Sequence, residues 1–432
     1  MQTVSNTSPR IVVLTDISSL LSGFAEPDDT QSLVRMLLYA NELDIEGLIA
    51  TYTEHAEGVR PEYIRHVIRQ YGRVRDKLAL HDARYPEEEA LLRVVKRGNP
   101  CDGVQFVGAE HDTEGSDWLI ACAERQDDRP LWISVWGGTT DLAQALWRMR
   151  ETKSKSQLRD MIAKLRVFSI GDQYGIGSWI RDEFPELFYV TSYKTFRGMY
   201  KGGNESSCSA QWLSQHVAGG HGALGAAYPI YDGGDPWGRV YGVKEGDSPA
   251  FLHLLCPGLN ADGRPEYGGW GGRYTLDPAL SSSTNHWFDA ADTIGDETSE
   301  RATVYRWREA YQNALIARMD RCALPPGQVN VEPIAIIASE SERWVRSGES
   351  IILDASASYD PLKSPLTWDW SVYPEAGTCS SGWRLEQSNE PIALFQAPNT
   401  TSSVSVHIVL TVTNQGTPPL NQYKRIIMHI SP

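Results

Sequence analysis

The sequence predicts an α/β fold with a mostly parallel, Rossmann-like sheet, followed by a separate β-sandwich. Three observations lead to this prediction. Buried apolar strands alternate with amphipathic helices from residue 10 to about residue 195, a stretch rich in Gly and aromatic residues follows to about residue 300, and an alternation of period two dominates after residue 328. Strand–helix alternation is typical of a parallel sheet covered on both faces, and short strands between Gly, Pro and Asn turns are typical of a sandwich. We therefore expect two domains, residues 1–324 and residues 328–432.

The elements of the first domain follow from apolar runs and helical spacing. Residues 11–14 are consecutive apolar residues, as in strands that are buried on both faces. Leu33, Met36, Leu37 and Ala40 repeat at helical spacing. Strands are expected at residues 10–15, 45–51, 131–136, 165–170 and 187–191, and helices from residue 33, through 63–71, from residue 141, over 179–184 and near 300–321.

The stretch from residue 195 to 300 is expected to form long loops over the active end of the sheet, because irregular segments of this length are usually functional. In the second domain, the period of two predicts strands at residues 334–337, 350–354, 366–372, 392–395, 404–412 and 424–430.

Composition excludes several classes of protein. The 432 residues are 41% hydrophobic and 22% charged, and the net charge of −15 argues against a nucleic-acid partner. No apolar run approaches the roughly 20 residues that a membrane span needs. The polar start lacks a signal-peptide core, so we expect a cytosolic protein or a removed leader. Six cysteines without CxxC spacing predict no zinc site, and 14 tryptophans exceed what a core needs, which favours a sugar ligand.

Acidic residues gather where the first strand ends and the first helix begins. Asp16 follows the strand, and Glu26, Asp28 and Asp29 precede the helix. One acidic residue at a helix start is explained by capping and by the helix dipole. Four that converge on one strand end would repel one another without a cation, and in parallel sheets ligands bind at this edge. The sequence therefore predicts a cation site here.

Two further segments are expected to complete this site. Ca²⁺ takes six to eight oxygen ligands from carboxylates, backbone carbonyls and water. The turn at residues 137–140 exposes carbonyl groups, including that of Thr140, and the acidic turn at residues 245–248 offers Asp247. Helix-start geometry alone is the alternative explanation of both turns. The predicted metal ligands are Asp16, Asp29, Thr140 and Asp247.

These segments resemble the motifs of nucleoside hydrolases. That family has an aspartate-rich D-x-D-P-G-x-D-D motif that binds Ca²⁺, a G-P-x-T-N-x-A turn, and a late turn with a last carboxylate. Thr15-Asp16 with residues 26–29 resembles the first motif, residues 137–143 resemble the second, and residues 246–249 resemble the third. The resemblance implies the nucleoside-hydrolase fold, a Ca²⁺ cofactor and a metal-bound site at the sheet edge.

The match is closer to the cellulose-binding, nucleoside-hydrolase-like branch of that superfamily, which also ends in a β-sandwich of immunoglobulin or PKD type. Three segments resemble sequences that are typical of this branch: residues 44–50, 179–189 and 265–274. The resemblance implies a carbohydrate ligand and favours a secreted or periplasmic location. Two departures are present: no second carboxylate follows Asp16 in a D-x-D pattern, and Glu245 and Gly246 stand where a base-protonating histidine is often found beside the last aspartate.

The residue roles expected from these patterns fall into two groups. Asp16 and Asp29 are the candidate catalytic residues. The candidate substrate-binding residues are Asp28, Glu26, Glu54, Asp172, Trp179 and Trp270, of which Trp270 lies in a Gly-Gly-Trp-Gly-Gly segment with no neighbouring packing residues. Surface turns, helix caps and core packing are the alternatives for the substrate-binding group.

Three functions remain open from sequence. The first is a Ca²⁺-dependent glycosidase that acts on a plant or microbial polysaccharide or oligosaccharide, with a carboxylate taking the proton of the attacking water. The second is a non-catalytic cellulose-binding protein on the same fold, and the third is a nucleoside N-ribohydrolase. The expected partner is a carbohydrate, and homo-oligomerisation is left open.

Overall fold

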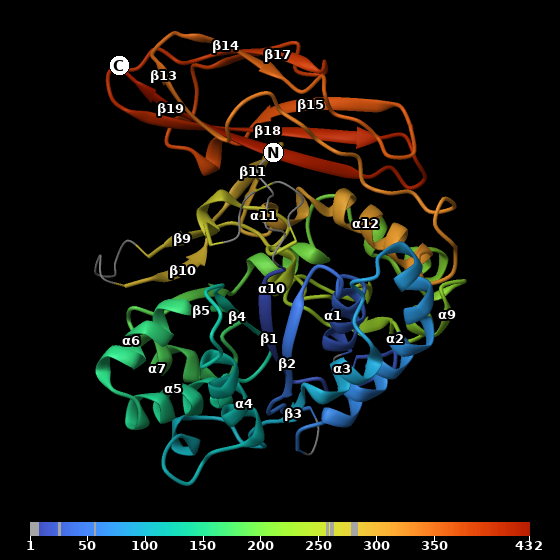
Figure 1. Ribbon diagram of the computed structural model, residues 1–432, viewed down its shortest axis with the longest axis vertical. Helices are drawn as coiled ribbons and strands as arrows, with labels where there is room; N and C mark the ends of the chain where they lie inside the picture. The colour runs from blue at the N-terminus through green and yellow to red at the C-terminus, as the bar shows by residue number, and fades with distance from the viewer. Residues whose placement is uncertain (1–7, 25–26, 56–57, 256–258, 260–262, 278–283) are drawn as a thin grey trace.

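The computed structural model describes residues 8–24, 27–55, 58–255, 259, 263–277 and 284–432. Its centre is an eight-stranded sheet in the order β3-β2-β1-β4-β5-β6-β10-β9 (Figure 1). All neighbours from β3 to β10 are parallel, and β9 alone is antiparallel to its neighbour. The predicted fold class is confirmed. The strands are β1 (Arg10–Thr15), β2 (Asp44–Ala50), β3 (Val95–Arg97), β4 (Leu131–Val135), β5 (Leu165–Ile170), β6 (Phe188–Ser192), β9 (Tyr274–Leu276) and β10 (His286–Asp289).

Helices cover both faces of this sheet. Alternate residues of each strand point to opposite faces, and both sets are apolar, so each face needs a layer of helices to bury it. Ile11 and Val13 of β1 belong to one hydrophobic cluster, whereas Val12 and Leu14 belong to the other. The helices are α1 (Asp28–Leu37), α2 (Pro61–His81), α3 (Glu88–Arg93), α4 (Glu114–Ala123), α5 (Thr140–Thr152), α6 (Lys155–Lys164), α7 (Ile176–Glu183), α8 (Ala210–Leu213), α9 (Gly222–Ala226), α10 (Pro249–Leu252), α11 (Ala302–Tyr305) and α12 (Arg308–Asp320).

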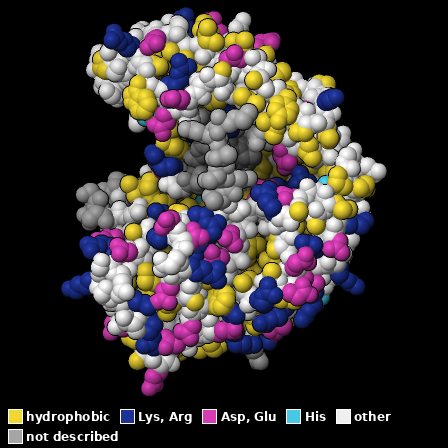
Figure 2. Space-filling view, in the orientation of Figure 1, with side chains coloured by type: hydrophobic (Ala, Val, Ile, Leu, Met, Phe, Trp, Pro, Cys, Tyr) yellow, Lys and Arg dark blue, Asp and Glu magenta, His cyan; other side chains and the backbone are white. Residues whose placement is uncertain are grey.

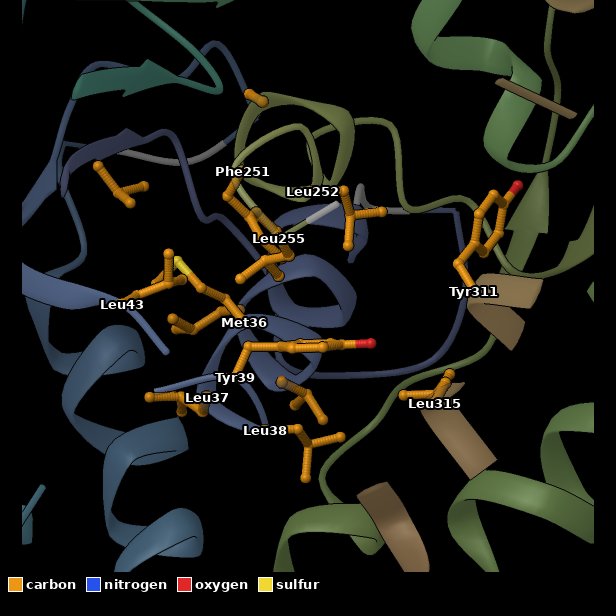
Figure 3. Packing of buried hydrophobic residues seen from close by; sticks show 14 of the residues in the cluster. Met36, Leu37, Leu38, Tyr39, Leu43, Phe251, Leu252, Leu255, Tyr311 and Leu315 are labelled. Carbon is orange, nitrogen blue, oxygen red and sulfur yellow. The ribbon is translucent and has the colours of Figure 1, made fainter. Parts of the chain in front are cut away.

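The short helix α10 packs against α1 and so fixes the loop that precedes α10. Figure 3 shows Phe251, Leu252 and Leu255 packed near Met36 of α1 and Tyr39 in the turn that follows it. These side chains are nearly or fully buried. Because residues 244–248 lead directly into α10, this packing holds that acidic turn beside the start of α1. Two short hairpin strands, β7 (Tyr231–Gly233) and β8 (Val240–Gly242), lie next to the same region.

The C-terminal residues form two sheets, in the orders β13-β19-β18-β15 and β14-β17-β16, around a core of their own. The prediction missed β13 and β16, and the strand expected at 334–337 makes only one isolated bridge, between Ile334 and Tyr359. The strands are β13 (Glu342–Arg346), β14 (Ser350–Asp354), β15 (Leu366–Val372), β16 (Arg384–Glu386), β17 (Ile392–Gln396), β18 (Val404–Asn414) and β19 (Asn421–Ser431); a further hairpin pairs β11 (Asp292–Ile294) with β12 (Glu297–Ser299).

The sandwich packs at the end of the central sheet where the parallel strands begin (Figure 1). Arg425 of β19 is buried and donates to the backbone carbonyls of Leu259 and Gly268, at 2.8 and 2.9 Å. Tyr373 donates to Asp292 at 2.5 Å and lies in the same hydrophobic cluster as α1 and α2. The carboxyl ends of the strands, where the acidic cluster was predicted, therefore lie at the opposite end of the sheet from the sandwich.

In the part of the chain that the structure describes, no helix is both long and apolar enough to cross a membrane. On the face drawn in Figure 2, Lys and Arg are interspersed with Asp and Glu, without a broad patch of a single charge.

Candidate acidic site at the carboxyl edge

The first turn of α1 does not use its aspartates as caps. The residue that precedes the helix is Pro27, and no side chain makes a capping hydrogen bond there. Asp29 instead accepts a hydrogen bond from the hydroxyl of Thr15, the last residue of β1. The Thr15 hydroxyl also accepts from the backbone N–H of Ile17 at 3.2 Å. The strand end and the helix start are therefore joined through a buried carboxylate, which helix capping does not explain.

Asp16 is held between the ends of β1, β4 and β5. Its carboxylate accepts from the hydroxyl of Tyr174 at 3.2 Å, and the side chain is only 5% exposed. On the other side, a Cβ atom added to Gly137 would lie 2.4 Å from Cγ of Asp16. Glycine is thus required at residue 137, because any larger residue would displace the carboxylate.

The turn at residues 244–248 brings Asp247 to the same edge. Asp247 is 3% exposed, and the residue that caps α10 is Ser248 rather than Asp247. A Cβ atom on Gly246 would lie 3.9 Å from one oxygen of Asp28, and the other oxygen of Asp28 is buried and accepts no hydrogen bond. We call Asp16, Asp28, Asp29 and Asp247 the acidic edge.

A buried ion pair fixes α1 to this turn. The guanidinium of Arg35 donates to Glu245, and both side chains have no exposed surface. Arg35 also donates to the carbonyl of Tyr311 at 3.1 Å, and Tyr228 donates to Glu245 at 2.5 Å. Burial alone would lower the pKa of Arg35, but the charge of Glu245 and its hydrogen bond raise that pKa above its usual value. Since this pair ties α1 to residues 244–248, it sets the spacing of Asp28 and Asp29 from Asp247.

Tyr174 was not predicted, and its hydroxyl donates to Asp16. It has a positive φ of 62°, and its ring packs edge-on against Tyr52, with 5.1 Å between the centroids. Burial, followed by the charge of Asp16, raises the pKa of Tyr174. Tyr174 is therefore a neutral donor that orients the Asp16 carboxylate.

Thr140 lies where the prediction placed it, at the start of α5. Its hydroxyl donates to Asp102 at 2.6 Å and accepts from the backbone N–H of Gly103 at 3.3 Å. Burial raises the pKa of Asp102. The next residue, Asp141, is fully buried, and burial raises its pKa to about 6 even though it accepts from the backbone of Asn99 and from Thr113. These contacts fix the turn; the predicted role of the Thr140 carbonyl as a ligand stays a prediction.

Asp172 and Trp179 make contacts within the protein rather than with the acidic edge. Asp172 pairs with Arg181 at 2.5 Å and accepts from the hydroxyl of Tyr189 at 2.8 Å, so it fastens the start of α7 to β6. Trp179 packs partly buried in the second core cluster, next to Phe184. The contacts of these two residues are therefore with α7, β6 and the second core cluster.

Trp270 is buried in the main core, although its neighbours in the sequence are glycines. It is 3% exposed and packs edge-on against Tyr311, with 6.3 Å between the centroids. Residues 263–274 lie on the side of the sandwich, where Gly268 accepts from Arg425, whereas residues 244–248 reach the acidic edge. The expected covering of the active end by the whole loop region is therefore only partly observed.

Glu54 follows β2 at the same edge of the sheet as Asp16. Its side chain is 63% exposed and lies 3.7 Å from His55, so it is accessible to a ligand. Glu26, which was predicted to bind substrate, lies outside the described residues.

The residues at the acidic edge suit a metal ion in the type of donor but not in their number. All the predicted donors are oxygen atoms, which suits a hard cation such as Ca²⁺. Among the residues that the structure describes, however, no three His, Cys, Asp or Glu side chains lie close enough together to hold a metal ion. The described side chains alone do not make the predicted calcium site.

The fold and the residues at this edge define a nucleoside hydrolase-like protein, and comparison with known families agrees. The family model described as "Cellulose-binding Sde182, nucleoside hydrolase-like domain" matches residues 10–274. A second family model, described as "Cellulose-binding protein Sde0182, C-terminal domain", matches residues 350–430. The chain belongs to this cellulose-binding, nucleoside hydrolase-like family. The resemblance inferred from sequence is confirmed.

A solved structure of a nucleoside hydrolase-related protein from Saccharophagus degradans, associated with carbohydrate metabolism, is similar over nearly the whole chain. It is 31% identical, with a TM-score of 0.82, and the match covers 98% of this chain and 100% of that chain. The PKD domain from KIAA 1837 protein matches 22% of this chain and 86% of its own at 16% identity, with a TM-score of 0.17, which is too low to support an inference. No curated protein matches the chain.

Proposed function

We propose that this protein hydrolyses glycosidic bonds of a carbohydrate at the acidic edge. The observation that carries the proposal is the hydrogen bond from Thr15 to Asp29: a buried carboxylate at a helix start is held toward the strand end instead of capping the helix. Asp16, in turn, is held by Tyr174. Membership in a cellulose-binding family, and a relative associated with carbohydrate metabolism, support a glycan as the substrate.

In this proposal the carboxylates have two tasks. Asp16 or Asp29 accepts a proton from water while the water oxygen forms a bond to the anomeric carbon. The bond from that carbon to the leaving oxygen breaks, the leaving oxygen takes a proton from a solvent water, and the carboxyl group returns its proton to solvent. The remaining negative charge at the edge stabilises the positively charged, oxocarbenium-like transition state. The Tyr174 hydroxyl keeps the Asp16 carboxylate oriented toward the site, as an effective general base requires.

A second candidate function is carbohydrate binding without turnover. A leaving oxygen needs a proton, and two buried histidines are placed elsewhere: His253 packs between Trp132 and Phe168, and His221 pairs with Asp320. His55 follows β2 beside Glu54, but the residues beside Asp247 are Gly246 and Glu245, and Glu245 pairs with Arg35. A nucleosidase often has a histidine at that position to protonate its leaving base, so this position favours the second candidate over a nucleosidase.

The experiment that separates these candidates is a substrate screen of the full chain, with and without Ca²⁺. The panel contains aryl-glycosides, cello- and xylo-oligosaccharides and the common nucleosides. We expect release of sugar from at least one carbohydrate and none from nucleosides. Binding of an oligosaccharide without any turnover would establish the second candidate, and nucleoside hydrolysis would contradict both.

We also propose a calcium ion at the acidic edge, and its test is thermal stability. Removing a carboxylate from a like-charged cluster should not destabilise the metal-free protein, whereas bound Ca²⁺ stabilises the folded state by mass action. We expect Asp29→Ala to melt within a few degrees of the wild type in EDTA and to gain little from millimolar Ca²⁺, while the wild type gains clearly. A variant that melts far below the wild type in EDTA would show that Asp29 is structural, and equal gains would place the ion elsewhere.

A further inference from the structure

An exposed tryptophan stands on the sandwich, far from the acidic edge. Trp344 lies in β13, an edge strand of the four-stranded sheet, and its side chain is 75% exposed. Its neighbour Val345 points inward and is 4% exposed, as expected from strand alternation. A Trp side chain this exposed contributes little to folding, since burial of its apolar surface is what would stabilise the fold.

The Trp344 ring is held in one orientation by the adjacent strand. His429 of β19 is its partner in the strand register and stacks on it, with 4.9 Å between the centroids and 21° between the planes. The Nε2 atom of His429 lies 3.0 Å from a carboxylate oxygen of Glu342, two residues before Trp344. Because His429 covers one face of the indole while most of the side chain stays exposed, the other face is open to solvent.

This ring lines a groove between the two sheets of the sandwich. The other wall is formed by β14, the edge strand of the three-stranded sheet, where Ile352 is 66% exposed. Figure 1 shows β14 on the outer side of the sandwich, away from the central sheet. The polar side chains that line the groove are Ser339, Glu340, Glu342, Arg343 and Asp354.

We infer that this groove binds a neutral β-glucan chain, with a sugar ring stacked on the open face of Trp344. A flat aromatic face suits the apolar face of a pyranose, and the surrounding carboxylates can accept hydrogen bonds from its hydroxyl groups. Three carboxylates face one arginine, so an anionic polysaccharide would be repelled. The family's description as cellulose-binding agrees with this ligand. The groove is separate from the acidic edge, so the inference goes beyond the proposed hydrolysis and does not depend on it.

The test is binding of the full chain to microcrystalline cellulose, measured by depletion from solution. Trp344→Ala should weaken binding about tenfold or more, as for a central aromatic contact, and Trp344→Phe should keep part of it. The matched control is Trp237→Ala, since Trp237 is 45% exposed but lies in the first domain, stacked by Arg197 and Arg301. This control should bind as the wild type does. Binding to polygalacturonate should be weak for all four proteins.

Three results would overturn the inference: no binding of the wild type to cellulose, equal binding by Trp344→Ala, or equal loss in Trp237→Ala. The groove could instead be filled by a second copy of the chain, so light scattering of the same samples measures the oligomeric state. A wild-type dimer that Trp344→Ala converts to a monomer would also overturn the inference. Turnover of a small soluble glycoside should be the same in Trp344→Ala and the wild type, so a failure here is distinguishable from a failure of the proposed hydrolysis.

Discussion

Replacing Arg35 with methionine should lower the free energy of unfolding by about 3–5 kcal/mol, because it leaves a buried carboxylate without its counter-charge. Glu245 has no exposed surface, and without Arg35 it keeps hydrogen bonds from the hydroxyls of Tyr228 and Ser248. Two neutral donors do not compensate a full negative charge in the interior. Chemical denaturation with a constant m value is the measurement.

The double variant Arg35→Met, Glu245→Gln is the control for this prediction. It removes both charges, and the glutamine amide can still accept from Tyr228 and Ser248, so we expect it to recover a large part of the lost stability. A single variant as stable as the wild type would show that the pair does not hold α1 to residues 244–248. A double variant less stable than the single one would mean that packing by the Arg35 side chain, rather than charge, is what matters.

Gly137→Ala should lower kcat/KM on the substrate found in the screen by about 100-fold, since small displacements of a reacting group cost this much. The added Cβ would lie 2.4–2.5 Å from three atoms of Asp16, so that side chain must move. Asp16→Asn, which keeps the shape but removes the base, should show a loss of at least about 100-fold as well. Steady-state kinetics of the folded variants provide the measurement.

Gly234→Ala is the matched control, because a Cβ atom there has nothing within 4 Å. It should leave kcat/KM unchanged. If Gly137→Ala is as active as this control, Asp16 is not where the reaction occurs.

Local patterns were sufficient to predict β1, β2, β4, β5, β6 and the first helix, whereas the short strands β3, β9 and β10 of the same sheet were missed. The residues of β1 and β5 are apolar and buried along nearly their whole length, so their strand type does not depend on distant partners. Asp28 and Asp29 stood out because capping needs one acidic residue at most. The strand β13 was missed because its sequence, Glu-Arg-Trp-Val-Arg, points only Val345 fully into the core.

Long-range contacts explain the remaining differences at the candidate site. Tyr174 lies 158 residues from Asp16, and Arg35 lies 210 residues from Glu245. No local pattern links such pairs. Trp270 was interpreted as a ligand-binding residue because glycines flank it, yet its packing partner Tyr311 comes from α12. Asp172 also follows a strand at the active end, but it forms an ion pair with Arg181 in the last turn of α7.

The most direct test of the acidic edge as the carbohydrate site is calorimetric titration of cellohexaose into two proteins. The first is Trp344→Ala, in which the sandwich groove is removed and the edge is intact; the second carries Gly137→Ala in addition. If the acidic edge binds the glycan, the first protein binds cellohexaose and the second loses at least about tenfold in affinity, which is 1.4 kcal/mol. Equal affinity of the two proteins, at equal folded fraction, would contradict the proposal that the glycan binds at the acidic edge.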